Sequence, residues 1–223
     1  MKKIFISRRI KKDSFFYKEI KEAGLELYGT SLLDFKQVAF EMIPPVDWIF
    51  FYSQKGVQYF FKNLNKKKMD LPANIRWAGF GQVTGKVIET YGVQCDFAGT
   101  GYAKTTAPAF FKKAKKQTVL FPRAKHSKRS VQKLLEGQIE MHDLIVYDNF
   151  PKKNIVLDNF DVLIFTSPMN AEAYFQSNEI RKGQQFFAIG ETTAKALKKL
   201  GVAEVLVPTN PSMEEIVKLV LAS

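Results

Sequence analysis

Small polar residues follow two apolar segments in the last third of the chain. Phe165-Thr166-Ser167-Pro168 ends one segment, and Gly190-Glu191-Thr192-Thr193 ends the next. A helical pattern begins at each group, so free backbone N–H groups and hydroxyls would gather at the ends of two strands. Such donors bind negatively charged groups. The residues therefore predict an anion-binding surface.

An earlier part of the chain repeats this arrangement. The Asp47…Ser53 spacing recurs in Asp161…Ser167, at an offset of 114 residues (161 − 47). The Gly81…Thr84…Gly92 spacing recurs in Gly190…Thr193…Gly201. Landmarks that recur in one order at nearly one offset indicate an internal duplication. We therefore expect two similar domains, each with its own anion-binding strand ends.

Two arginines occupy equivalent positions in the two copies. Residues 5–8 resemble residues 120–123, which places Arg8 and Arg123 at corresponding strand ends. Either they bind carboxylates or they are ordinary exposed arginines. The sequence leaves both interpretations open.

Apolar segments of strand length alternate with helical patterns along the chain. We expect strands at residues 3–7, 25–28, 47–52, 75–79, 93–97, 118–121, 139–147, 161–166, 185–189 and 204–207. We expect helices at residues 13–23, after Ser53, and at 82–91, 105–115, 127–136, 167–177, 192–200 and 212–221. Residues 29–42 and 149–154 are predicted connectors. Strands separated by helices of this length predict an α/β fold of parallel sheets flanked by helices.

The charge balance indicates a polyanionic partner. The 223 residues carry 34 Lys and Arg against 22 Asp and Glu, a formal net charge of +12. Such a field raises the local concentration of polyanions. One cysteine, Cys95, fits a reducing cytoplasm, and with two histidines it offers too few ligands for most metal sites, so we expect no metal. The apolar segments are shorter than the ~20 residues of a membrane span, so we expect no membrane partner.

With these landmarks in place, the sequence resembles the uroporphyrinogen-III synthase family over essentially its whole length. The resemblance is carried by the order and spacing of residues 161–168, 188–194 and 208–215. The extended segment 145–147 resembles the family's interdomain strand, with its tyrosine at Tyr147. The first copy departs from the pattern: 52–55 replaces a Thr-Ser-Pro-like strand end, and 81–84 is a loose Gly-x-x-Thr element.

The resemblance implies a discontinuous architecture. A terminal α/β domain would comprise residues 1–30 and 152–223, and an inserted central α/β domain would comprise 40–142. Linkers at 31–39 and 143–151 would form a two-stranded crossing, and the substrate site would lie between the domains. Periodicity alone leaves open which pieces of the chain pack together.

The resemblance also implies a cofactor-independent reaction. The family closes the linear tetrapyrrole hydroxymethylbilane, with loss of a hydroxyl and inversion of the last pyrrole ring. This substrate has eight carboxylates, which agrees with the excess of positive charge. Together with Arg8 and Arg123, which come from the internal repeat, the predicted substrate-binding residues are Ser53, Gln54, Gly81, Gln82, Thr84, Ser167, Pro168, Met169, Gly190, Glu191, Thr192 and Thr193.

The resemblance and its place in the crossing segment make Tyr147 the candidate catalytic residue, because a positioned phenol can protonate the leaving hydroxyl. Packing alone also explains a tyrosine in a strand. Conformational control of the substrate would supply most of the rate. We expect a cytoplasmic monomer that binds a small polyanionic tetrapyrrole and no nucleic acid. A transient contact with the preceding enzyme of the pathway stays open.

Other interpretations of these residues remain. Ser53, Ser167 and Thr192 are also explained as helix N-caps, which is compatible with ligand binding. Gly79-Phe80-Gly81-Gln82-Val83-Thr84-Gly85 is one residue from a dinucleotide-binding fingerprint but lacks its first-strand context. The charge and the 13% aromatic content would suit a nucleic-acid-binding protein, yet no recognised motif interleaves aromatic residues with the lysines.

Overall fold

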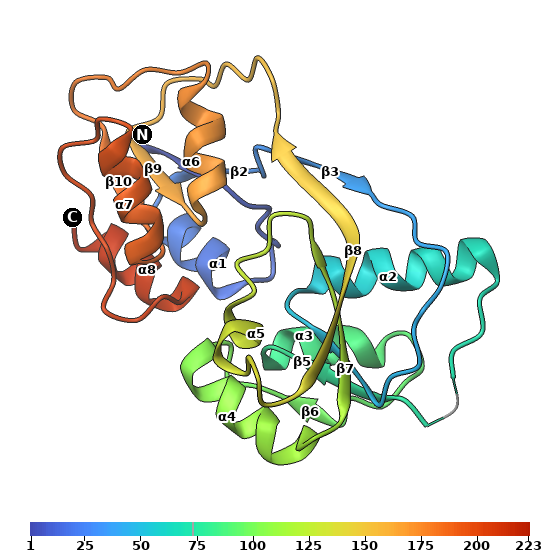
Figure 1. The fold of residues 1–223 in the computed structure, drawn as a ribbon. Coiled ribbons are helices and arrows are strands. Elements are labelled where there is room, and N and C mark those ends of the chain that lie inside the picture. The colour runs from blue at the N-terminus through green and yellow to red at the C-terminus, as the bar shows by residue number, and fades with distance from the viewer. Residues whose placement is uncertain (73) are drawn as a thin grey trace. The chain divides into compact units, whose positions relative to one another are not determined.

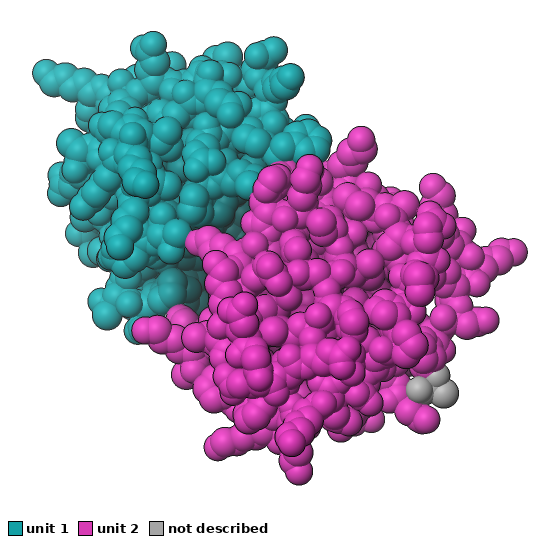
Figure 2. All heavy atoms as spheres, viewed as in Figure 1, with its two compact units in different colours: residues 1–34, 150–223 teal, residues 35–149 magenta. Residues whose placement is uncertain are grey.

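The chain folds into two compact units. The computed structural model describes residues 1–72 and 74–223. Residues 1–34 and 150–223 form unit 1, and residues 35–149 form unit 2 (Figure 2). The chain therefore leaves unit 1 after Asp34 and returns to it at Phe150.

Unit 1 contains a four-stranded parallel sheet. Its strand order is β10 (Gln185–Ala188), β9 (Val162–Phe165), β1 (Lys3–Ile6) and β2 (Glu26–Gly29). Residues distant in sequence are paired in it, with Ile4 opposite Val162. The helices of this unit are α1 (Phe15–Glu22), α6 (Pro168–Phe175), α7 (Glu191–Lys199) and α8 (Met213–Leu221) (Figure 1).

Unit 2 is built on a six-stranded sheet. The order is β3 (Leu33–Gln37), β8 (Glu140–Pro151), β7 (Thr118–Ala124), β4 (Trp48–Phe51), β5 (Arg76–Gly79) and β6 (Phe97–Ala98). The pairs from β8 to β6 are parallel. The helices are α2 (Gln54–Lys67), α3 (Gln82–Glu89), α4 (Ala103–Ala114) and α5 (Ser130–Leu134).

The two sheets confirm the predicted duplication. The order β8-β7-β4-β5 in unit 2 corresponds to β2-β1-β9-β10 in unit 1, and β4 and β9 are the two strands related by the offset of 114 residues (162 − 48). The α/β fold class with parallel sheets flanked by helices is confirmed as well.

Apolar residues on both faces of the strands hold these layers together. In β4, Trp48 and Phe50 belong to the cluster with α4, while Ile49 and Phe51 belong to the cluster with α2 and α3. All four are at most 1% exposed. Each such side chain contributes about 1.5 to 3 kcal/mol on burial. A strand buried on both faces is therefore read correctly as a continuous apolar segment.

The predictions were wrong mainly at sheet edges. Residues 29–42 were predicted to be a connector but contain β3, and β8 continues through Pro151. Instead of a strand at 93–97, only the two residues of β6 pair with β5. The strand predicted at 204–207 is reduced to one bridge, between Phe187 and Leu206. An edge position is paired on one side only, so fewer hydrogen bonds maintain its extended backbone.

Among the described residues, none of the helices has the length and apolar character that crossing a bilayer requires.

Candidate functional site

The carboxyl ends of β4 and β5 bring two helix N-termini to one edge of the unit 2 sheet. Ser53 follows β4 and caps α2, its Oγ accepting the Gly56 N–H at 3.1 Å. After β5, Gly79 packs so closely on α3 that an added Cβ would lie 2.8 Å from the Gly85 nitrogen. Gly81 caps α3 without a side chain. The first-turn amides of α3 are therefore available to an anion.

A cavity of about 450 Å³ opens at this edge. It is lined by Tyr52, Ser53, Gln54, Lys55, Gln58 and Thr84. Three of these residues, Ser53, Gln54 and Thr84, were predicted from the sequence. Lys55 supplies the positive charge of the cavity, and its Nζ lies 5.0 Å from the centre of the Phe35 ring. Donors and one cation around a concave surface suit a carboxylated ligand.

Lys55 and Gln58 were missed by the sequence analysis, although a signal was present. Once Ser53 is taken as the N-cap of α2, Lys55 falls in the first helical turn. Gln58 is then one turn beyond Gln54, on the same face. Helical periodicity from the cap would have placed both beside the strand end.

Tyr147 lies in β8 with its hydroxyl at the predicted site. Its Oη is 3.2 Å from Ser53 Oγ, and its ring stacks on Tyr59 with centroids 5.2 Å apart. Tyr147 is only 8% exposed, and burial raises the pKa of its phenol above the ordinary value. The phenol is therefore protonated at neutral pH and able to donate a proton.

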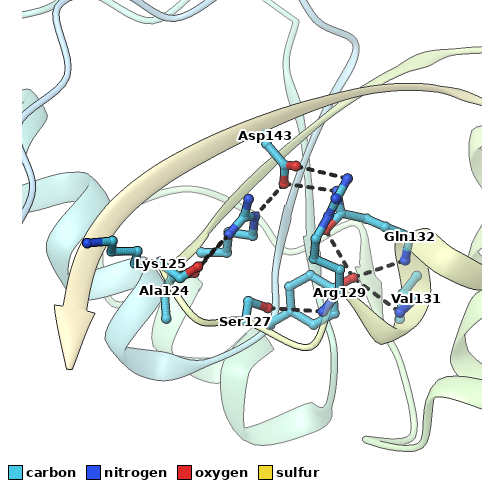
Figure 3. A network of polar contacts seen from close by, with 9 residues as sticks. Ala124, Lys125, Ser127, Arg129, Val131, Gln132 and Asp143 are labelled. Carbon is cyan, nitrogen blue, oxygen red and sulfur yellow. Dashed lines mark hydrogen bonds and ion pairs between the residues drawn. The ribbon is translucent and has the colours of Figure 1, made fainter. Parts of the chain in front are cut away.

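A polar network holds the neighbouring segments in place (Figure 3). Asp143 binds Arg123 and accepts a 3.0 Å hydrogen bond from Gln132 Nε2, while Arg129 Nη2 lies 3.0 Å from its Oδ2. The Tyr52 hydroxyl accepts the N–H groups of Val131 and Gln132 at 3.2 and 3.0 Å. The network thus ties β4, β7, β8 and the start of α5 together.

The protonation of this network follows from its surroundings. Burial alone would raise the pKa of Asp143, but hydrogen bonds from Arg123 and Gln132 and the charges of Arg123 and Arg129 lower it overall. Burial raises the pKa of Tyr52 to about 12. Arg123 was predicted to bind substrate. Its side chain is 11% exposed and forms an ion pair with Asp143.

Unit 1 has a corresponding edge. Ser167 follows β9 and caps α6, its Oγ accepting the Asn170 N–H at 3.3 Å, and Pro168 and Met169 begin the helix. Thr166 N donates to the buried Ser7 Oγ at 2.8 Å, which fixes the ends of β1 and β9 to each other. The position of Ser167 as a cap was predicted.

The next strand end in unit 1 carries the other predicted donors. Gly190 follows β10 and caps α7 without a side chain. Thr192 was considered as an N-cap, which is wrong, because it lies inside the first turn of α7. Glu191 carries a negative charge, so only its amide, and not its side chain, suits an anion. Thr193 is 3% exposed, and its N–H donates to Gly190 O at 3.0 Å.

The structure groups most, but not all, of the predicted residues. Gly81, Gln82 and the cavity residues share the carboxyl edge of unit 2. In unit 1, Arg8 is exposed and follows β1, whose carboxyl end lies at the same sheet edge as those of β9 and β10. The side chain of Arg123 is engaged by Asp143, and that of Gln82 donates to Ala98 O at 3.3 Å.

Comparisons with known proteins agree with the sequence resemblance. A model of the family described as uroporphyrinogen-III synthase HemD matches residues 16–218. A uroporphyrinogen-III synthase of Chlorobaculum parvum is 29% identical over 93% of both chains. The comparisons do not favour the dinucleotide-binding or nucleic-acid-binding alternatives.

Solved structures share the fold. A uroporphyrinogen-III synthetase of Helicobacter pylori covers 100% of this chain and 99% of its own, with 23% identity and a TM-score of 0.73. A mutant uroporphyrinogen III synthase of Thermus thermophilus has the same coverage, with 16% identity and a TM-score of 0.61. Because the family model spans nearly the whole chain, the protein belongs to the uroporphyrinogen-III synthase family, cyclising lyases of tetrapyrrole synthesis.

Proposed function

We propose that the chain performs the reaction of its family by holding carboxylates of hydroxymethylbilane at the strand-end amides and hydroxyls of its sheets. The support is the pair of side-chain-free caps, Gly81 and Gly190, at the starts of α3 and α7. A carboxylate satisfies such amides without a dedicated cationic partner. In unit 2, Lys55 and Thr84 extend the donor set around the cavity.

The chemical step that we assign to Tyr147 is proton transfer. Its phenol donates a proton to the terminal hydroxyl of the substrate, which leaves as water. The resulting cation is attacked by the substituted carbon of the last pyrrole ring, and the spiro intermediate rearranges. A pyrrole carbon then loses a proton, which returns to the Tyr147 phenolate. No cofactor enters this balance.

The observation that carries this assignment is the 3.2 Å contact between Tyr147 Oη and Ser53 Oγ, because Ser53 itself lines the cavity. Ser53 Oγ already accepts the Gly56 N–H. The position of Ser53 is thereby fixed, and so is that of the phenol in contact with it. A general acid in a fixed position contributes about 10² to 10⁴ in rate.

We also propose a monomer in the cytoplasm that acts without nucleic acid or membrane. The low cysteine content supports the compartment. Transient delivery of substrate by the preceding enzyme of the pathway is compatible with this arrangement.

The test is a product analysis. Freshly prepared hydroxymethylbilane is supplied to the purified protein, the products are oxidised, and the isomers are separated. We expect type III uroporphyrin in excess of the type I isomer that forms spontaneously. A product mixture equal to the protein-free control would contradict the proposal.

A further inference from the structure

A second concave surface lies away from the candidate site, at the C-terminal end of α4. We call it the cationic groove, and it has a volume of about 920 Å³. Lys112, Lys113, Lys115 and Lys116 line it from the end of the helix and the following turn. Arg76, Phe111 and Gln117 complete the lining. Five of its seven residues are cationic, and none is acidic.

The cations of the groove are not paired with carboxylates of the described residues. None of the five takes part in the ion pairs found among the described residues. The four lysines are exposed. The five positive charges repel one another, and a bound anion would reduce this repulsion.

The floor of the groove is fixed. The Arg76 guanidinium lies 4.4 Å from the Trp48 ring centroid and donates to Gln117 Oε1. Trp48 Nε1 donates to the same oxygen at 3.0 Å. Trp48 is 1% exposed, so these contacts attach the groove to the core of unit 2. A fixed floor lowers the entropic cost of binding.

The turn that presents the lysines has an unusual backbone. Lys115 has φ 47° and ψ −124°, a left-handed conformation in which glycine is usual. Strain of this kind is retained where the surrounding structure maintains it, often at functional positions. Here it turns the chain so that Lys115 and Lys116 face the same groove as Lys112 and Lys113.

The cationic groove and the candidate site lie at opposite edges of the unit 2 sheet. β5 begins at Arg76, and Gln117 directly precedes β7. Both therefore mark the amino ends of parallel strands, whereas Ser53 and Gly81 follow the carboxyl ends. The opposite edge of the sheet cannot belong to the substrate site described above.

We propose that the cationic groove binds an acidic polypeptide segment of a partner protein, one that alternates carboxylates with an apolar side chain. The charge calls for several carboxylates, and the half-buried Phe111 with the lysine stems offers apolar contact. A single small anion would leave most of the 920 Å³ empty. Single-stranded nucleic acid stacks successive bases on open aromatic faces, whereas this groove offers only the half-buried Phe111, because the Trp48 ring is covered by Arg76. A second copy, also at +12, would be repelled.

The test uses fluorescent twelve-residue peptides and binding anisotropy. One peptide alternates Glu with Leu, a second contains Glu with Ser, and a single-stranded RNA of equal charge is the third probe. We expect the Glu/Leu peptide to bind most tightly, with affinity that falls as salt rises. In the K112Q/K113Q/K115Q/K116Q variant we expect the affinity to fall at least about fivefold.

The control variant carries K18Q, K182Q, K198Q and K199Q, four exposed lysines of unit 1 that lower the net charge equally. We expect its peptide affinity to stay within about twofold of the parent. Equal losses in the two variants would attribute binding to the general field and overturn the proposal. So would tighter binding of the RNA. The kcat and the isomer ratio of hydroxymethylbilane conversion should be unchanged in the groove variant, which separates this test from that of the proposed activity.

Discussion

The hydroxyl of Tyr147 is the proton donor of the proposed reaction. Replacing it by Phe keeps the ring that stacks on Tyr59 and removes the hydroxyl beside Ser53. We expect kcat to fall roughly 100-fold or more, because a general acid is lost. The unfolding free energy should change by about 1 kcal/mol, the value of one hydrogen bond.

Tyr59→Phe is the matched control, since it removes a hydroxyl from the other ring of the same stack. Steady-state kinetics with isomer analysis measures both variants. Equal turnover in Tyr147→Phe and the parent protein would remove Tyr147 from the mechanism.

Asp143 ties stability to pH. Its folded-state pKa lies below the ordinary value, because two arginines and Gln132 outweigh the effect of burial. The ionised form thus stabilises the fold above the ordinary pKa of 3.8, and this contribution is lost as pH falls through the lower folded-state pKa. In Asp143→Asn we expect a loss of about 1 kcal/mol at pH 7, screened by solvent.

Thermal unfolding at pH 7 and pH 3 measures the effect. The parent should lose more stability in acid than Asp143→Asn, so the two melting temperatures should converge. Asp13→Asn, at an exposed position in unit 1, should follow the parent. Parallel curves for the parent and Asp143→Asn would show that Asp143 is not the titrating group.

Single residues were predictable where local sequence decides their role. Ser53 and Ser167 stand before helical patterns, and both cap helices. The occupation of Arg123 could not be predicted, because Asp143 reaches it from another strand, 20 residues later. Gln132 was missed for the same reason. Its partners Tyr52 and Asp143 come from strands that only the fold brings together.

At the scale of elements, the position of α3 depends on a close approach of backbone to backbone. In Gly79→Ala, the new Cβ would meet the Gly85 nitrogen at 2.8 Å, so β5 and α3 must separate. We expect a loss of about 1 to 3 kcal/mol in stability. We also expect a lower kcat/KM, because the first turn of α3 moves away from the cavity.

Gly190→Ala provides the comparison, because its new Cβ would meet the Pro211 side chain at an ordinary 3.4 Å. Its melting temperature should stay close to that of the parent. Denaturant unfolding measures the stability of both variants, and steady-state kinetics measures their kcat/KM. A Gly79→Ala protein as stable as Gly190→Ala would refute the packing argument.

Central strands were predicted better than edge strands for a physical reason. β4 and β9 are buried on both faces and read as unbroken apolar segments. In β3, exposed Asp34 and Lys36 alternate with Leu33 and Phe35, and the short alternation gives little signal. The helix predicted at 127–136 is only Ser130–Leu134, because Arg129 adopts φ 53° and a helix cannot continue through that conformation.

The whole molecule combines a duplicated fold with a strong positive charge. The repeat was visible in the sequence because both copies keep the same strand-end spacing. Which segments share a sheet was not, since the pairing of Ile4 with Val162 leaves no local signal. The net charge, by contrast, follows from the sequence alone. It predicts electrostatic attraction of the proposed substrate with its eight carboxylates.

A net charge of +12 should accelerate the capture of an octa-anion over distances that salt screens. The screening length is about 10 Å at 0.1 M salt and shortens as salt rises. We expect kcat/KM to fall several-fold between about 0.02 and 0.3 M salt, with kcat nearly constant, because contacts made after capture are shorter than the screening length. Kinetics across this range, with the four-lysine variants of both units, measures the effect. Since each variant lowers the same total charge by four, both should weaken the salt dependence alike. A kcat that falls with salt at constant KM would place the charges at the chemical step instead of at capture.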